Sequence, residues 1–219
     1  MSGFTVLTVC TGNVHRSPLA AVMLERWASW YLPPDLVEHV SVGSAGTGPP
    51  VGAPIGELPR LIVKALGGDP SGHRARRITD ELVAGADLVL AASRTHRDDL
   101  LTRVPSAMRR TFTFREAGRT AERLGPRPAP LGIEELRRTV ADLAENRVPP
   151  STPDDDDIID PQGLPPAAYL QMASEEIPAL ASLASSLLGM PRGDLEAYRA
   201  AASDATQLGI LGSDQGASR

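Results

Sequence analysis

Hydrophobic residues along the chain fall into short β-branched runs and into longer stretches where they recur every three or four positions. The short runs predict strands at 4–9, 37–42, 87–92 and 111–113. The longer stretches predict helices at 18–30, 58–66, from 95 onward, 115–124, 132–145 and 167–188. Strands that alternate with helices indicate a parallel sheet covered on both faces. The expected fold is therefore α/β, a three-layer αβα sandwich with a four-stranded parallel sheet.

The predicted organisation is one domain, residues 1–190, followed by a tail. Residues 191–219 are rich in Ala, Ser, Gly and Asp, which predicts disorder with a short helix near 195–202. Pro178 falls inside the last helical pattern and predicts a kink or a break. The long segment 105–157 is interpreted either as a lid or as an insertion.

Composition and charge narrow the classes of function. The net charge is −5 and the chain has no basic block, so a nucleic-acid partner is not expected. No apolar run approaches the roughly 20 residues that span a bilayer, and no leader pattern opens the chain. These features predict a cytoplasmic protein with no membrane partner. A single cysteine excludes a disulfide within the chain and a cysteine zinc site.

That cysteine, Cys10, ends the first predicted strand, and Arg16 follows six positions later at the start of a helix. A loop of this length can turn its backbone N–H groups toward an anion, and the helix start adds positive field. The planar fork of Arg16 matches two phosphate oxygens. The same field favours the thiolate form of Cys10, to which the hydroxyl of Ser17 can donate. Ser17 is also expected to cap the helix, with Pro18 in its first position.

The segment 9–18 (Val-Cys-Thr-Gly-Asn-Val-His-Arg-Ser-Pro) resembles the signature loop of the low-molecular-weight protein tyrosine phosphatase family, which arsenate reductases of the same fold share. Three further segments resemble the family's motifs in the same order. These are 44–47 (Ser-Ala-Gly-Thr), 73–76 (His-Arg-Ala-Arg) and 160–161 (Asp-Pro). The resemblance covers roughly residues 4–190.

The resemblance implies a role for each residue that matches a family motif. Cys10 is the nucleophile, Arg16 the phosphate clamp and Asp160 the general acid. Ser44 and His73 support the loop through a hydrogen-bonded network with Asn13. The residues that bind the phosphate group are Thr11, Gly12, Asn13, Val14, His15 and Ser17.

Asp160 is also the candidate that elementary chemistry selects. A phosphate ester needs its leaving oxygen protonated, and the same carboxylate can then deprotonate the attacking water. Ile158 and Ile159 can anchor this position, and Pro161 can stiffen it. The neighbouring run 154–157 is interpreted as a solvated acidic loop.

Two departures from the family pattern affect what the site is expected to do. The aromatic residues that line the substrate groove are absent, because the two matching stretches read Gly-Pro-Pro-Val-Gly at 48–52 and Pro-Gln-Gly at 161–163. Each lost stacking partner is worth about 1 kcal/mol for an aryl phosphate. Ser93 also replaces an Asp that members often carry after the third strand, and we expect weaker support for the loop.

Three functions are compatible with these residues. The first is hydrolysis of a phosphate monoester through a cysteinyl-phosphate intermediate, on a phosphorylated protein or a small ester. The second is arsenate reduction, which would need an external low-molecular-weight thiol because Cys10 stands alone. The third is a module that binds phosphate or phosphoproteins without turnover. No metal or organic cofactor is expected, and the sequence leaves the oligomeric state open.

Overall fold

The computed structural model describes residues 3–208 and confirms the predicted α/β architecture. Four parallel strands form one sheet in the order β2-β1-β3-β4. The strands are β1 (Phe4–Cys10), β2 (Val40–Gly46), β3 (Leu88–Ala91) and β4 (Thr111–Thr113). The helices are α1 (Arg16–Tyr31), α2 (Pro34–Val37), α3 (Glu57–Ala65), α4 (Asp80–Ala84), α5 (Arg94–Arg103), α6 (Phe114–Leu124), α7 (Ile133–Glu145), α8 (Pro166–Leu187) and α9 (Arg192–Ala201). Pro105–Arg110 and Pro153–Asp156 form short 3₁₀ helices.

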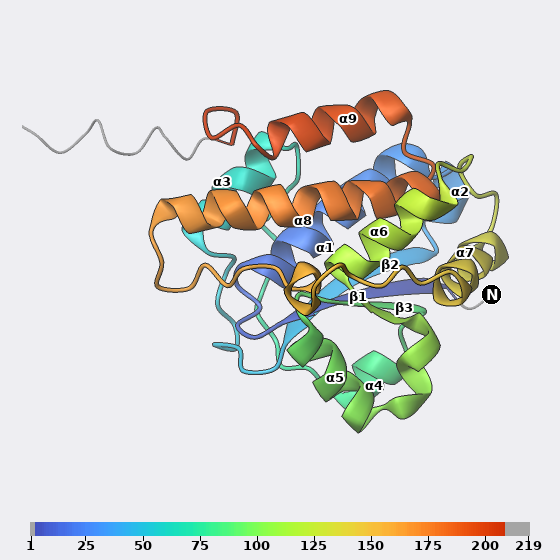
Figure 1. The fold of residues 1–219 in the computed structure, drawn as a ribbon, viewed down its shortest axis with the longest axis horizontal. Coiled ribbons are helices and arrows are strands. Elements are labelled where there is room, and N and C mark those ends of the chain that lie inside the picture. The colour runs from blue at the N-terminus through green and yellow to red at the C-terminus, as the bar shows by residue number, and fades with distance from the viewer. Residues whose placement is uncertain (1–2, 209–219) are drawn as a thin grey trace, which may run out of the picture.

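Helices cover both faces of the sheet, as the alternation of strands and helices predicted (Figure 1). Phe4 and Val6 of β1 belong to one buried cluster, with residues of α1, α6 and α8. Leu7 and Val9 point to the other face and belong to a second cluster beneath α4 and α5. Successive side chains of a strand point to opposite faces, so one apolar strand supports both layers.

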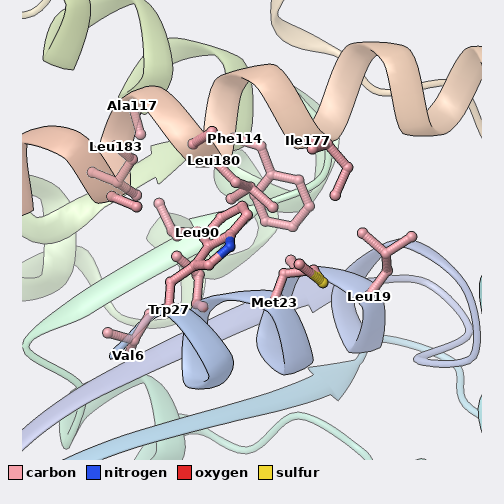
Figure 2. Packing of buried hydrophobic residues seen from close by; sticks show 14 of the residues in the cluster. Val6, Leu19, Met23, Trp27, Leu90, Phe114, Ala117, Ile177, Leu180 and Leu183 are labelled. Carbon is pink, nitrogen blue, oxygen red and sulfur yellow. The ribbon is translucent and has the colours of Figure 1, made fainter. Parts of the chain in front are cut away.

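The larger cluster lies between α1 and α8 (Figure 2). Leu19, Met23 and Trp27 project from α1 toward Ile177 and Leu180 of α8, and all five side chains are fully buried. Their spacing of three and four positions places them on one face of each helix. This packing fixes α1, whose first turn follows Cys10, against the sheet.

The second strand ends later than its pattern predicted. It runs to Gly46 rather than Val42, and its last four residues, Gly43–Gly46, are small and have weak strand propensity. Pairing with β1 places Ser44 beside Thr8 and Gly46 beside Cys10. These backbone bonds hold the small residues extended and bring the end of β2 beside the end of β1.

Both helices predicted near the C-terminal end are present. α8 continues through Pro178 without a break, because its apolar residues are buried on both sides of the proline (Figure 1). The short helix predicted near 195–202 is present as α9, which packs on α8. Its Tyr198 meets Trp27 edge-on, with ring centroids 4.9 Å apart. Residues 209–219 of the predicted tail lie outside the described residues. Of the helices in residues 3–208, none combines the length and apolarity needed to cross a membrane.

The long segment 105–157 supplies part of the fold rather than a lid over Cys10. It contains β4, which completes the sheet, and α6, which packs along α8. Its helix α7 lies at the opposite end of the sheet from Cys10, where Arg137 donates to the carbonyl of Gly3 and pairs with Asp87 (Figure 1). The lid interpretation is therefore wrong for α7, which lies at the amino ends of the strands.

Among residues 3–208, Glu176 of α8 is the carboxyl side chain with 0% of its surface exposed. Neither of its oxygens has a hydrogen-bond partner among the described residues. Burial raises the pKa of Glu176 well above its usual value, and the positive charge of Arg16 only partly opposes this shift. Folding therefore favours the protonated form of this side chain, relative to an unfolded chain in which the pKa of Glu is about 4.3.

We expect Glu176→Gln to flatten the loss of stability at rising pH. Because the pKa is raised on folding, the protonated form stabilises the folded state at low pH, and that contribution is lost as pH rises toward the folded pKa. The free energy of unfolding is measured in urea at about pH 5 and about pH 8, and it should fall less between these values in the variant than in the parent. The difference between the two proteins should be at most about 1.4 kcal/mol per pH unit. Glu38→Gln, at an exposed position, is the control. A difference between Glu176→Gln and the parent that does not change with pH would contradict this account.

Candidate active site

Cys10 lies at the carboxyl end of β1, with only 1% of its surface exposed. Its Sγ atom is 3.0 Å from the hydroxyl of Ser17 and accepts a hydrogen bond of 3.3 Å from the backbone N–H of Asn13. Helix α1 begins at Arg16 and no side chain caps its first turn. The unpaired N–H groups and the positive helix end therefore lie close to the sulfur. Ser17 is not the cap that the sequence predicted, because its hydroxyl contacts Cys10 instead.

Asn13 fixes the turn of this loop. Its φ of 51° is left-handed, a conformation that Asn adopts more readily than most residues. Its side-chain amide donates to the hydroxyls of Ser17 at 3.0 Å and Ser44 at 2.8 Å. Its side-chain oxygen accepts from the N–H of Arg76, and its carbonyl accepts a 2.8 Å bond from Nε2 of His73. The structure thus places Ser44 and His73 in one network with Asn13, where the family resemblance put them.

Burial favours the neutral form of His73. The pKa of His73 is lowered, chiefly by burial, although its bond to the carbonyl of Asn13 acts in the opposite direction. A neutral imidazole carries one N–H, and His73 Nε2 must hold it to donate to that carbonyl. In either charge state the Nε2–H group of His73 supports the loop through the carbonyl of Asn13.

The end of β2 approaches the loop so closely that only glycine fits there. A Cβ atom on Gly46 would lie 2.4 Å from the carbonyl oxygen of Thr11 and 3.0 Å from the Cβ of Asn13. The next two residues, Thr47 and Gly48, donate their N–H groups to the carbonyls of Cys10 and Thr11 at 3.0 Å. The loop carbonyls are thus bonded on this side, which leaves the loop N–H groups for an anion.

Arg16 is 4% exposed and connects the loop to the segment 158–160. Its Nη1 donates to the carbonyl of Ile158 at 3.2 Å, and its Nη2 lies 2.5 Å from Oδ2 of Asp160. Its Nε is buried with no partner among the described residues. A buried donor without a partner is energetically costly. An anionic ligand that accepts a hydrogen bond from Nε would remove this cost.

The segment that carries Asp160 is held by backbone bonds on both sides. The N–H of Ile158 donates to the carbonyl of Ala92 at 2.9 Å, which extends the segment along the end of β3. The N–H of Ile159 donates to the carboxylate of Glu175 on α8 at 2.9 Å. Asp160 itself remains 46% exposed at its side chain. The carboxyl group therefore stands at the edge of the site on a fixed backbone.

The acidic run 154–157 is not the solvated loop that its composition indicated. Asp156 is buried and pairs with Arg119 of α6 at 2.5 Å. Asp157 accepts from the N–H of Arg94 at 2.7 Å and pairs with its guanidinium at 3.3 Å. Only Asp154 is almost fully exposed. The run anchors the segment 158–160 to α5 and α6, which could not be read from the sequence because the paired arginines are far away in the chain.

A pocket of about 240 Å³ opens above the sulfur. It is lined by Cys10, Thr11, Gly12, Val14, His15, Arg16, Gly48, Pro50, Asp160 and Gln162. This lining contains no Phe, Tyr or Trp, as predicted, and its one ring is the imidazole of His15. Among residues 3–208, His, Cys, Asp and Glu side chains form no group of three that could hold a metal ion.

His15 forms one wall of this pocket and is backed by a residue that the sequence analysis missed. Tyr169 of α8 meets the imidazole edge-on, with ring centroids 5.4 Å apart. Burial lowers the pKa of His15, and Arg16 lowers it further, whereas Asp160 opposes the shift. The pKa of Tyr169 is raised, chiefly by burial. Nothing in the local sequence links Tyr169 to the loop, because α8 reaches it only in the folded chain.

Ser93 contacts the loop through a second residue. Its hydroxyl lies 2.6 Å from Nδ1 of His96, and Nε2 of His96 lies 2.9 Å from the hydroxyl of Thr11. His96, three residues later on the first turn of α5, is the partner that spans the distance between them.

Comparison with known proteins agrees with this geometry. The family model described as low molecular weight phosphotyrosine protein phosphatase matches residues 5–149, which is more than half of the chain. A protein-arginine-phosphatase from Geobacillus stearothermophilus is 31% identical over 149 residues, covering 65% of this chain and 95% of that protein. A probable low molecular weight protein-tyrosine-phosphatase from Ralstonia nicotianae is 35% identical over 112 residues, covering 51% of this chain and 71% of that protein.

Solved structures show the same fold. The arginine phosphatase structure from G. stearothermophilus covers 83% of this chain and 90% of its own, with 26% identity and a TM-score of 0.56. A low molecular weight protein tyrosine phosphatase from T. tengcongensis covers 83% and 97%, with 27% identity and a TM-score of 0.57. The chain therefore belongs to the low molecular weight protein-tyrosine-phosphatase family, and its class of activity is that of a phosphoric monoester hydrolase.

Proposed function

We propose that the protein hydrolyses phosphate monoesters through a cysteinyl-phosphate intermediate. One observation carries this proposal: the sulfur of Cys10 opens to the same pocket as the guanidinium of Arg16 and the carboxyl of Asp160. A nucleophile, an oxyanion clamp and a proton donor are the three groups that the reaction needs.

In the first step, the thiolate of Cys10 attacks phosphorus while the bond from phosphorus to the leaving oxygen breaks. Asp160 gives its proton to that oxygen, so the leaving group departs as a neutral alcohol. Arg16 and the loop N–H groups hold the three remaining oxygens. In the second step, Asp160 takes a proton from water, the water oxygen bonds to phosphorus, and the S–P bond breaks. Ser17 donates to the sulfur and stabilises the thiolate that is released.

The ion pair between Arg16 and Asp160 belongs to the free enzyme in this scheme. The 2.5 Å contact occupies one nitrogen of the guanidinium that the phosphate group requires. Entry of the substrate therefore replaces a carboxylate oxygen by phosphate oxygens around Arg16. It also releases Asp160, which must carry a proton when it acts on the leaving group.

Cys10→Ser should abolish hydrolysis of p-nitrophenyl phosphate, lowering kcat by about three orders of magnitude or more, because a hydroxyl is a far weaker nucleophile than a thiolate. The assay compares the variant with the reduced parent protein, with circular dichroism as a check that both are folded. Retention of activity by the variant would contradict the proposed nucleophile. Absence of turnover by the folded parent would instead favour arsenate reduction with an external thiol, or phosphate binding alone.

Asp160→Asn should lower kcat by about 10²- to 10⁴-fold, because the amide can neither give nor take the proton. Binding of inorganic phosphate should be unchanged or tighter, since the variant frees Arg16 and removes a negative charge from the pocket. Phosphate binding is measured as the inhibition constant against p-nitrophenyl phosphate. Asp154→Asn, whose side chain is 94% exposed, is the matched control and should behave like the parent. Equal losses of turnover and of phosphate binding in Asp160→Asn would show that the residue shapes the loop rather than moving a proton.

Phosphoarginine is a second candidate substrate, and the lining of the pocket favours it over phosphotyrosine. A phenyl ring finds no aromatic side chain to stack on, whereas His15, Asp160 and Gln162 offer polar atoms at the pocket wall. Burial lowers the pKa of His15, which favours the neutral imidazole, and the neutral ring has one nitrogen that can accept a hydrogen bond from a guanidinium N–H. One similar protein is a protein-arginine-phosphatase, which is consistent with this chemistry.

Two peptides that differ only in carrying phosphoarginine or phosphotyrosine test this preference. We expect kcat/KM to favour the phosphoarginine peptide by about fivefold or more, which corresponds to about 1 kcal/mol of missing stacking. Gln162→Tyr, which returns an aromatic ring beside Asp160, should raise kcat/KM for the phosphotyrosine peptide by a similar factor. A parent enzyme that prefers phosphotyrosine, or a variant that gains nothing, would contradict this assignment.

A further inference from the structure

Three polar side chains that the reaction scheme does not use form a chain of hydrogen bonds that ends in the catalytic loop. Ser93 follows β3, His96 lies in the first turn of α5, and Thr11 directly follows Cys10. The contacts are 2.6 Å from Ser93 Oγ to His96 Nδ1 and 2.9 Å from His96 Nε2 to Thr11 Oγ1. Ser93 and His96 are 9% and 8% exposed, so the path is largely shielded from water.

The contacts of Ser93 at the cap of α5 bear on which nitrogen of His96 carries the proton. Ser93 is the N-cap residue, and its Oγ accepts the backbone N–H of His96 at 3.3 Å. Ser93 Oγ has a second lone pair, so its 2.6 Å contact is compatible with either tautomer of His96. We adopt the tautomer in which the Ser93 hydroxyl donates its proton to Nδ1. A neutral imidazole with Nδ1 as acceptor carries its proton on Nε2, so His96 donates to Thr11.

His96 stays neutral at the pH of any ordinary assay. Burial lowers the pKa of His96 to about 4, and the charge of Arg16 adds to this effect. The carboxylates of Asp160, Asp157 and Asp99 act in the opposite direction but do not outweigh the burial. The donor on Nε2 is therefore present throughout the neutral range.

Thr11 lines the pocket above Cys10, and its hydroxyl can donate one hydrogen bond. Because its oxygen already accepts the proton of His96, its own proton is directed to another acceptor. A phosphate oxygen in the pocket is such an acceptor. We propose that His96 is a positioning residue, which holds the Thr11 hydroxyl as a donor to the phosphate group in the pocket. This inference rests on the proposed function only in naming phosphate as the ligand.

His96→Asn and His96→Gln form a matched pair of variants. The amide nitrogen of Gln can reach the position of Nε2 and keep the bond to Thr11, whereas the shorter Asn reaches only the position of Nδ1. We expect His96→Asn to raise the KM for p-nitrophenyl phosphate and the inhibition constant of inorganic phosphate by about three- to tenfold, the range of one hydrogen bond. The change in kcat should be less than about twofold, because the contact is equally present before and during the reaction. His96→Gln should stay close to the parent.

A double-mutant cycle with Thr11→Val separates positioning from general support of the loop. Thr11→Val alone should raise both constants as much as His96→Asn does, and the double variant should raise them no further. An effect of His96→Asn that persists in the Thr11→Val background would overturn the proposal. Equal effects of the Asn and Gln variants would also overturn it.

The tautomer of His96 provides a readout that needs neither ligand nor turnover. Long-range ¹H–¹⁵N spectra of the protein at neutral pH should show the proton of His96 on Nε2. A proton on Nδ1 would overturn the proposal even if the enzyme is active. If the tautomer is Nε2–H but neither phosphate binding nor hydrolysis is detected in the parent, the proposed function fails, and so does the role of Thr11 toward phosphate.

Discussion

Asn13, fully buried at the turn of the catalytic loop, satisfies every polar group it has within the protein. Its backbone N–H points to the sulfur of Cys10, and its carbonyl accepts from His73. Its side chain joins the loop to Ser44 at the end of β2 and to the N–H of Arg76. A left-handed residue in this position is unfavourable unless its surroundings fix it. These bonds provide that fixation, and the direction of the loop N–H groups depends on it.

The segment 158–160 forms the wall of the site across from Asn13, and charged side chains rather than a strained turn hold it in place. Arg16 bonds to the carbonyl of Ile158 and to Asp160, so the start of α1 and the segment 158–160 are connected directly. Asp157 and Asp156 tie the same segment to arginines of α5 and α6. The protein has a net charge of −5, yet much of its negative charge near the site is paired with arginine. A phosphate group therefore meets a pocket in which Asp160 is the carboxylate left to be displaced.

The fold class and the place of the loop could be predicted because they depend on local patterns. Apolar periodicity gave the strands and most helices, and one cysteine six positions before an arginine marked the loop. The errors arose where distant residues decide the outcome. Pairing with β1 extends β2 to Gly46, and packing on both sides carries α8 through Pro178. His96 and Tyr169 could not be linked to the loop, because each reaches it only after the helices have packed.

The most direct test of the account is whether a phosphate group is transferred to Cys10. The enzyme is mixed with p-nitrophenyl phosphate and quenched in acid, and the modified residue is located by peptide mass spectrometry. Asp160→Asn is the best variant for trapping, because p-nitrophenolate leaves without a proton donor whereas the attack by water still needs a base. The account predicts phosphate on Cys10, accumulating in Asp160→Asn and absent from Cys10→Ser. Turnover by the parent with no phosphate on Cys10 in either protein, or phosphate on another residue, would contradict it.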